Sequence, residues 1–248
     1  MYIDENKINC SSKIIGYGSY STIYLSEYKK HEYACKVFDQ HCYKIDKKQE
    51  EKFEKLCNKY NKSNLILPKY LIKNNNITSY LTDYYNGNTF DKLFYNTFDN
   101  KIKYLRIVKN LIIKLHSELQ IVHSDIHFGN ILFNSEKQDV AIIDFDNSKI
   151  EDLMPEYCYL STSASDFLSY NDFDCNIDIH LFNLLSFGLL NNMGQKDAFY
   201  NLNNPKYNSF FTSKTALKTL EDISLYKKNN NFLIDMIDEN YIKYYKHI

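Results

Sequence analysis

Three side chains that carry oxygen atoms lie at short intervals in the middle of the chain. Asp125 is followed five positions later by Asn130, and Asp144 comes fourteen positions after Asn130. They belong to the segments His-Ser-Asp-Ile-His-Phe-Gly-Asn-Ile-Leu-Phe (123–133) and Ala-Ile-Ile-Asp-Phe-Asp (141–146). A loop and the strand after it can place three such groups around one point. Hard cations such as Mg²⁺ prefer oxygen ligands, and nucleotide phosphates complete their coordination shell. The spacing therefore predicts a site for a metal-bound phosphate.

A glycine-rich turn and a strand lysine lie upstream of these residues. Gly16 and Gly18 are part of Ile-Gly-Tyr-Gly-Ser-Tyr-Ser-Thr-Ile (15–23), between two predicted strands. Glycine lets the backbone approach a phosphate and direct N–H groups at it. Lys36 lies inside the apolar strand Tyr-Ala-Cys-Lys-Val-Phe, where a buried lysine needs an anionic partner. Each feature alone is weak, because such a turn is often only a hairpin and such a lysine often faces solvent.

In their order and separations, these segments resemble the protein-kinase superfamily over roughly residues 13–190. His123-Ser124-Asp125 with Asn130 is similar to the catalytic loop H-R-D-x-x-x-x-N, and the segment 144–146 stands at the place of D-F-G. Ala-Cys-Lys resembles the lysine strand V-A-I-K, and the glycine-rich turn resembles G-x-G-x-x-G-x-V with serine as the third glycine.

Two further segments extend the resemblance toward the C-terminus. The apolar stretch that begins at Asp178 and contains Gly188 resembles the buried helix whose aspartate supports the catalytic loop. Ala-Ser-Asp at 164–166 occupies the place of A-P-E.

The resemblance implies a role for each matching residue. Asp125 would accept or orient the proton of the attacking hydroxyl, and Asn130 and Asp144 would hold Mg²⁺. Lys36 would pair with the α- and β-phosphates of ATP and with a carboxylate of the helix that follows it in the chain. Counting back from the strand expected at Leu65–Leu67 favours Glu54 for that carboxylate, with Glu50 and Glu51 as alternatives.

The resemblance also implies a nucleotide pocket. Residues 80–85 would form the hinge beside adenine, with Thr82 bordering the pocket and backbone groups of Asp83 to Tyr85 as hydrogen-bonding partners. The residues expected to cover the nucleotide come from the glycine-rich turn and are Gly16, Gly18, Ser19 and Ile23.

Three positions depart from the protein-kinase pattern. Ser124 replaces the loop arginine that receives a phosphorylated activation segment in many protein kinases, and Arg106 is the only arginine in the chain. We therefore predict activity that does not depend on activation-loop phosphorylation. His127 stands where Ser/Thr kinases usually have lysine and resembles aminoglycoside phosphotransferases and choline-kinase relatives. Asp146 replaces glycine, and it either adds a carboxylate near the metal or caps a turn.

Hydrophobic patterning predicts the elements that position these residues. Alternating residues indicate strands at 13–15, 21–27, 33–38, 65–73 and 77–83, with a helix at about 46–60. Helical spacing then dominates, at 101–120 and 178–190. We therefore predict an α+β, bilobal fold similar to a protein kinase. Residues 1–85 form a small antiparallel sheet lobe with one helix, and residues 86–248 form a reduced, mainly helical lobe.

Composition places the chain among ordinary globular proteins. Of its 248 residues 44% are hydrophobic and 25% are charged, and the formal net charge is −1. This charge gives no reason to expect nucleic acid or a membrane as a partner. The first residues are polar and no apolar run is long enough for a span, so we expect neither a signal peptide nor a transmembrane segment. Six cysteines without a C-x-x-C pair favour a reducing compartment, hence the cytoplasm.

The favoured function is an ATP- and Mg²⁺-dependent protein kinase that phosphorylates serine or threonine hydroxyls of a protein substrate. The first alternative is a small-molecule kinase of the aminoglycoside phosphotransferase or choline kinase type, which would act on a small hydroxyl compound. The second alternative is a pseudokinase that serves as a binding module. The sequence gives no basis for an oligomeric state.

Overall fold

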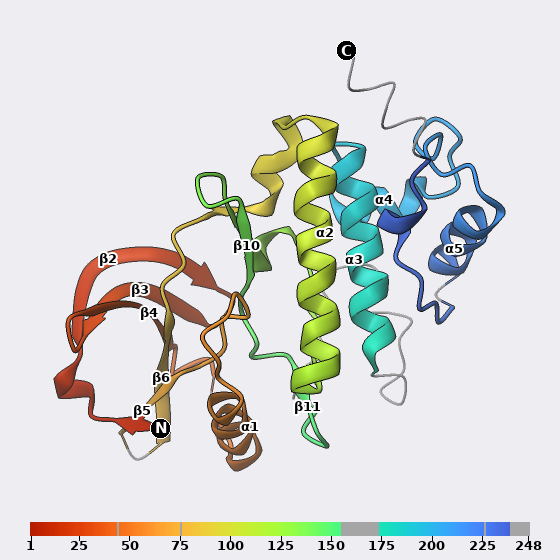
Figure 1. Ribbon diagram of the computed structural model, residues 1–248. Coiled ribbons are helices and arrows are strands. Elements are labelled where there is room, and N and C mark those ends of the chain that lie inside the picture. Colours follow the sequence, from red (N-terminus) through yellow and green to blue (C-terminus); the bar gives the residue numbers. More distant parts are fainter. Residues whose placement is uncertain (44, 75, 155–173, 226, 239–248) are drawn as a thin grey trace.

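A six-stranded sheet forms the N-terminal part of the computed structural model, which describes residues 1–43, 45–74, 76–154, 174–225 and 227–238. The strand order is β1-β5-β6-β4-β3-β2, and every neighbouring pair is antiparallel except the parallel pair β1 and β5. The strands are β1 (Tyr2–Ile3), β2 (Asn9–Gly18), β3 (Ser21–Tyr28), β4 (His31–Phe38), β5 (Tyr70–Asn74) and β6 (Asn76–Asp83). Figure 1 shows this sheet curving beside helix α1 (Lys47–Asn58).

The strand expected from residue 65 begins later than the hydrophobic pattern suggests. Strand β5 starts at Tyr70, whereas Leu65 forms a parallel bridge with Ile142 in the other part of the chain. The backbone N–H of Ile66 donates to the carbonyl of Ile142 at 2.9 Å. Pro68 follows, and its missing N–H removes a donor that a strand in the sheet would use. Residues 65–67 are therefore not a strand of the six-stranded sheet; they connect the N-terminal part of the molecule to the C-terminal part.

Helix α1 lies against the sheet through an apolar face that contains two polar residues. Asp46 caps its N-terminus by accepting a hydrogen bond from the backbone N–H of Gln49 at 2.8 Å. Phe53 is fully buried and packs against Tyr80 of β6, with ring centroids 5.5 Å apart. Gln49 and Lys52 are also buried on this face, which places them toward the interior rather than in solvent.

The C-terminal part is mainly helical and contains two small sheets. Its helices are α2 (Phe98–Lys114), α3 (Cys175–Leu190), α4 (Gln195–Asn201) and α5 (Lys214–Ser224), with a π-helical turn at Leu115–Leu119 after α2. Its strands are β7 (Asn88–Thr89), β8 (Ile121–Val122), β9 (Ile131–Asn134), β10 (Asp139–Ile142) and β11 (Lys149–Ile150), arranged as β10-β9-β7 and β11-β8. Short 3-10 turns occupy Glu5–Lys7, Phe90–Tyr95, Phe128–Asn130 and Leu233–Met236.

Helix α3 is the centre of the helical part. Nearly all its residues from Ile177 to Leu190 are buried, as expected for a helix that is apolar on every side. It lies beside α2, and α4 and α5 cover its other faces (Figure 1). This packing fixes the position of Asp178 in the first turn of α3, directly beneath the loop after β8.

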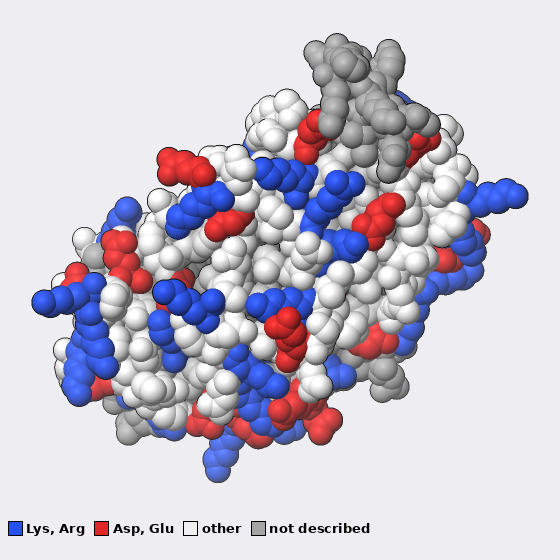
Figure 2. Space-filling model, viewed as in Figure 1, with Lys and Arg blue, Asp and Glu red and all other residues white. Residues whose placement is uncertain are grey.

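The surface shows no single dominant charge. Lys and Arg side chains are interspersed with Asp and Glu over the described part of the face in Figure 2. Among the residues that the structure describes, no helix combines the length and the apolar character that crossing a membrane requires.

Candidate active site

A buried aspartate holds the loop that contains Asp125. Asp178 is fully buried, and its carboxylate accepts hydrogen bonds from the backbone N–H of His123 at 2.8 Å and of Ser124 at 2.7 Å. Its Oδ2 also contacts Nε2 of His116 at 2.8 Å. Ser124 has a φ of 63°, in the left-handed region that non-glycine residues rarely adopt. The carboxylate therefore stabilises a strained turn, and the support expected from Asp178 is confirmed.

His123 joins this loop to the segment that contains Asp144. Its ring is fully buried, with Nε2 2.8 Å from the carbonyl oxygen of Ile143 and Nδ1 accepting from the backbone N–H of Asp125 at 3.2 Å. The carbonyl requires a donor at Nε2 and the N–H requires an acceptor at Nδ1, so the hydrogen bonds assign the neutral Nε2–H tautomer. A buried neutral imidazole thus fixes the distance between the two segments.

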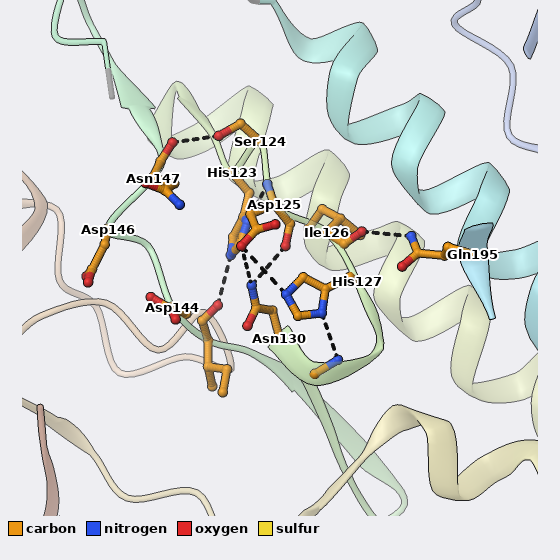
Figure 3. A network of polar contacts seen from close by, with 12 residues as sticks. His123, Ser124, Asp125, Ile126, His127, Asn130, Asp144, Asp146, Asn147 and Gln195 are labelled. Atoms are coloured by element: carbon orange, nitrogen blue, oxygen red, sulfur yellow. Dashed lines mark hydrogen bonds and ion pairs between the residues drawn. The ribbon is translucent and has the colours of Figure 1, made fainter. Parts of the chain in front are cut away.

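Asp125 and Asn130 contact each other directly. The amide Nδ2 of Asn130 donates to Oδ2 of Asp125 at 2.9 Å and to its backbone carbonyl at 3.0 Å. Nε2 of His127 lies 3.6 Å from the same Oδ2, while its Nδ1 accepts from the backbone N–H of Gly129 at 3.0 Å. The imidazole therefore presents Nε2–H to the carboxylate. Figure 3 shows these side chains grouped around Asp125.

Lys36 lies between two carboxylates. Its Nζ is 2.6 Å from Oδ1 of Asp144 and 2.7 Å from Oδ2 of Asp146. Burial alone would lower the pKa of Lys36, but the charges and hydrogen bonds of Asp144 and Asp146 outweigh it and raise the pKa above its ordinary value. Burial raises the pKa of Asp146 against the lowering effect of Lys36. Lys36 is therefore a firmly protonated cation inside the site.

Two oxygen atoms of this cluster suit a hard cation. Asn130 uses its Nδ2 toward Asp125, and Asp144 uses its Oδ1 toward Lys36. Asn130 Oδ1 and Asp144 Oδ2 accept no hydrogen bond from the residues that the structure describes. Within that part of the chain no three His, Cys, Asp or Glu side chains are grouped so that they could hold a metal by themselves. A Mg²⁺ ion at this point would therefore take its remaining ligands from phosphates and water.

Two adjoining cavities contain most of the residues that the sequence singled out. The first, of about 620 Å³, is lined by Lys36, Asp125, Asn130 and Asp144, together with Gly18 and Ser19. The second, of about 450 Å³, is lined by Gly16, Ile23, Thr82, Asp83 and Tyr85, and again by Lys36, Asn130 and Asp144. The structure thus brings the expected catalytic and metal-binding residues and the expected nucleotide-binding residues together around Lys36 and Asp144.

Gly18 allows the turn to lie close over the first cavity. A Cβ atom on Gly18 would lie 2.6 Å from Oγ of Ser21 and 3.8 Å from Cε of Lys36. A side chain at this position would therefore displace Ser21 from β3 and narrow the space above Lys36.

The side chains of Asp83 and Tyr85, in the expected hinge, are bound by neighbouring residues. Asp83 accepts hydrogen bonds from the Tyr60 hydroxyl at 2.5 Å and from Lys69 Nζ at 2.9 Å. Lys69 also lies 4.8–5.7 Å from the ring centres of three tyrosines, among them Tyr60. The hydroxyl of Tyr85 donates to Asp139 at 2.6 Å. These contacts fix both side chains beside the second cavity, which Asp83 and Tyr85 help to line.

Glu54 does not contact Lys36, which corrects the pairing expected from the sequence. Its Oε1 accepts from the hydroxyl of Tyr2 in β1 at 2.5 Å. The two alternatives also face outward, since Glu50 pairs with Lys73 at 3.2 Å and Glu51 with Lys55 at 3.1 Å. The helix is rotated so that Phe53, and not Glu54, faces Phe38 and Tyr80 of the sheet.

Sequence reasoning missed three residues that surround Asp146. Lys52 of α1 donates to the backbone carbonyl of Asp146 at 2.6 Å, and the hydroxyl of Tyr80 donates to its Oδ1 at 2.5 Å. Gln49 lines the first cavity beside them. A signal was present in α1, because Gln49 and Lys52 share the spacing of the apolar residues Phe53 and Leu56. Polar groups at core positions indicate a buried polar partner.

Ala-Ser-Asp at 164–166, matched by the sequence to the place of A-P-E, lies outside the described residues. The described residues end at 154 and resume at 174, where Asp174 caps α3.

Comparison with known proteins agrees with this geometry. The family model of the protein kinase domain matches residues 10–240. A search of curated proteins finds no match. The match covers both the glycine-rich turn and the helical part, and with it the α+β bilobal kinase fold expected from the sequence is confirmed. The chain belongs to the protein kinase domain family.

Proposed function

We propose that this chain is an ATP- and Mg²⁺-dependent protein kinase that transfers the γ-phosphoryl group to serine or threonine hydroxyls. The observation that carries the proposal is the meeting of Lys36, Asp125, Asn130 and Asp144 at one cavity of about 620 Å³. Phosphoryl transfer depends mainly on positioning and on stabilising charge. A protonated lysine, an aspartate and two metal-binding oxygens supply those two requirements.

Each of these residues would serve a distinct step. Asp125, with Oδ2 fixed by Asn130 at 2.9 Å, would orient the acceptor hydroxyl and take its proton. Lys36 would bind the phosphates of ATP. Asn130 and Asp144 would hold Mg²⁺, which supplies charge neutralisation on the phosphate oxygens when it is bound. The second cavity would hold adenine against the backbone of Asp83 to Tyr85.

A small-molecule kinase is the second candidate, and His127 favours it. Nε2 of His127 is 3.6 Å from Oδ2 of Asp125 and lies in the same cavity. A histidine at this point replaces the long, permanently charged lysine of Ser/Thr kinases with a shorter ring. Such a site leaves more room beside Asp125 for a compact hydroxyl compound.

The test is phosphoryl transfer from γ-labelled ATP with Mg²⁺, with a generic basic protein and with a panel of aminoglycosides and choline as separate acceptors. Wild type should transfer label to the protein acceptor. In Asp125→Asn and Lys36→Met the rate of phosphoryl transfer should fall at least about 100-fold. The control Glu118→Gln, at an exposed position, should transfer label at the wild-type rate. The 100-fold figure is about the lower bound expected for a lost acid–base group. Label only on a small hydroxyl compound would establish the second candidate. Nucleotide binding without transfer to any acceptor would refute both and leave a pseudokinase binding module.

A further inference from the structure

Asp146 joins three elements inside the site through its carboxylate and its backbone carbonyl. Its Oδ2 lies 2.7 Å from Nζ of Lys36 on β4, and its Oδ1 accepts from the hydroxyl of Tyr80 on β6 at 2.5 Å. Its backbone carbonyl accepts from Nζ of Lys52 on α1 at 2.6 Å. The Asp146 side chain is only 13% exposed, and Figure 3 shows it pointing away from Asp125. It is therefore directed at the lysine rather than at the acceptor site.

Helix α1 offers no acidic residue on its buried face. Its three glutamates are engaged elsewhere, with Lys73 and the backbone N–H of Ile77 for one, Lys55 for another and Tyr2 for the third. The buried polar residues on the inner face are Gln49 and Lys52. The helix thus contributes a cation to the interior, and the segment after Asp144 contributes the anion.

The charges near Lys36 explain why the carboxylate comes from the segment after Asp144 and not from α1. Lys36 is buried and needs compensating charge. Asp144 is the expected metal ligand, so its charge would be shared with Mg²⁺, whereas the carboxylate oxygens of Asp146 contact Nζ of Lys36 and the hydroxyl of Tyr80. A glutamate on the inner face of α1 would place a third carboxylate beside one lysine, and like charges at such short distances destabilise one another.

We propose that Asp146 takes the place of the helix carboxylate and is the positioning residue that holds Lys36 toward the nucleotide, while Lys52 ties α1 to the same segment. The inference rests on the proposed function only in that Lys36 must bind ATP. It has a direct consequence, because the glycine usual at this position would disable the site rather than restore it. Asp146 and an acidic inner face on α1 would be mutually exclusive.

The test is a double-mutant cycle between Asp146 and Gln49, which lines the same cavity. Asp146→Asn and Asp146→Gly should each lower kcat/KM about 10- to 100-fold, the loss expected for one charge-assisted hydrogen bond. Gln49→Glu alone should also lower it, through repulsion. Gln49→Glu combined with Asp146→Gly should recover at least about tenfold over Asp146→Gly. This reversal of sign would not arise from a merely structural role.

Affinity for Mg²⁺-ATP, measured by titration calorimetry, gives a readout that does not require turnover. If wild type binds ATP but transfers no phosphate, the proposed function fails. The ATP affinities of wild type, Asp146→Gly, Gln49→Glu and the double variant then still decide the role of Asp146. Circular dichroism shows whether each variant folds. Should the Asp146 variants not fold, Tyr80→Phe removes only the hydroxyl bound to Oδ1 and should weaken ATP binding about three- to tenfold.

Where the Asp146 variants fold, three results would overturn the inference. The first is an Asp146→Asn protein with wild-type affinity and turnover. The second is a folded double variant that regains nothing over Asp146→Gly. The third is a Glu54→Gln protein that loses as much as Asp146→Asn, since Glu54 contacts Tyr2 and should be dispensable for ATP binding. A Tyr80→Phe protein with unchanged affinity would have the same force where the Asp146 variants do not fold.

Discussion

Replacing Asp178 by asparagine should cost about 3–5 kcal/mol of the free energy of unfolding. The carboxylate is fully buried and accepts from two backbone N–H groups and contacts His116, all within 2.8 Å. Asparagine has one oxygen, so its amide NH₂ must face at least one of these donors. Losing a hydrogen bond to a charged acceptor costs about 1.5–3 kcal/mol, and an orphaned buried N–H adds about 1–3 kcal/mol. The remaining bonds also weaken because the acceptor becomes neutral.

Urea unfolding followed by far-ultraviolet circular dichroism measures this loss, since the chain contains no tryptophan for fluorescence. The midpoint should fall without a change in the slope m. The matched control is Asp174→Asn in the same helix. Asp174 caps α3, and its carboxylate pairs with an exposed lysine at 2.9 Å. Asparagine also caps well and exposed ion pairs contribute little, so the control should lose no more than about 1 kcal/mol.

The reasoning would be refuted if Asp178→Asn unfolded within about 1 kcal/mol of wild type, or no more easily than Asp174→Asn. Either result would mean that the loop keeps its shape without the charge. The left-handed φ of 63° at Ser124 would then have to be stabilised by its own hydroxyl, which donates to the carbonyl of Asn147 at 2.5 Å.

Three shorter predictions concern pH, regulation and the hinge. Burial lowers the pKa of His180 from 6.5 to about 4, so the folded state disfavours the charged ring, and stability should fall by at most about 3 kcal/mol between pH 7 and pH 4. His180→Gln should flatten that part of the profile in urea titrations, and an unchanged slope would contradict it. Ser124 offers no guanidinium for a phosphate, so phosphatase treatment should leave turnover unchanged, and a many-fold loss would refute this. Lys69→Met should destabilise by about 1–2 kcal/mol through the lost contacts with three tyrosines and the lost ion pair with Asp83. Lys29→Met, which removes a contact with one ring, should cost under about 1 kcal/mol, and equal losses would contradict the prediction.

The grouping of the candidate site residues could be predicted because it depends on local spacing. Asp125, Asn130 and Asp144 lie on one loop and the segment after β10, so short-range geometry suffices to bring their oxygens together. The glycine-rich turn is equally local, since β2 and β3 pair directly across it. The two central helices were visible from apolar spacing, and α3 begins at Cys175, three residues before the predicted start.

The orientation of α1 could not be predicted in the same way. The glutamates at 50, 51 and 54 supply acidic residues around much of the helix, and any of them fits a lysine partner if the rotation of the helix is unknown. The rotation depends on which residues fill the space against Phe38 and Tyr80 of the sheet. Phe53 fills that space, and the hundred-degree step between helical residues then turns Glu54 away from Lys36.

The partner of Lys36 could not be predicted from the sequence for a further reason. The carboxylates near Lys36 come from a segment that is distant in the chain. Asp146 lies more than a hundred positions from Lys36, and Asp144, two positions before it, has a left-handed φ of 65°. From the sequence, Asp146 fits a metal ligand or a turn cap equally well. The structure adds that Lys52 of α1 donates to the backbone carbonyl of Asp146, so the buried face of the helix presents a cation to this segment. A buried lysine specifies that a carboxylate must be near, but the fold decides which element provides it.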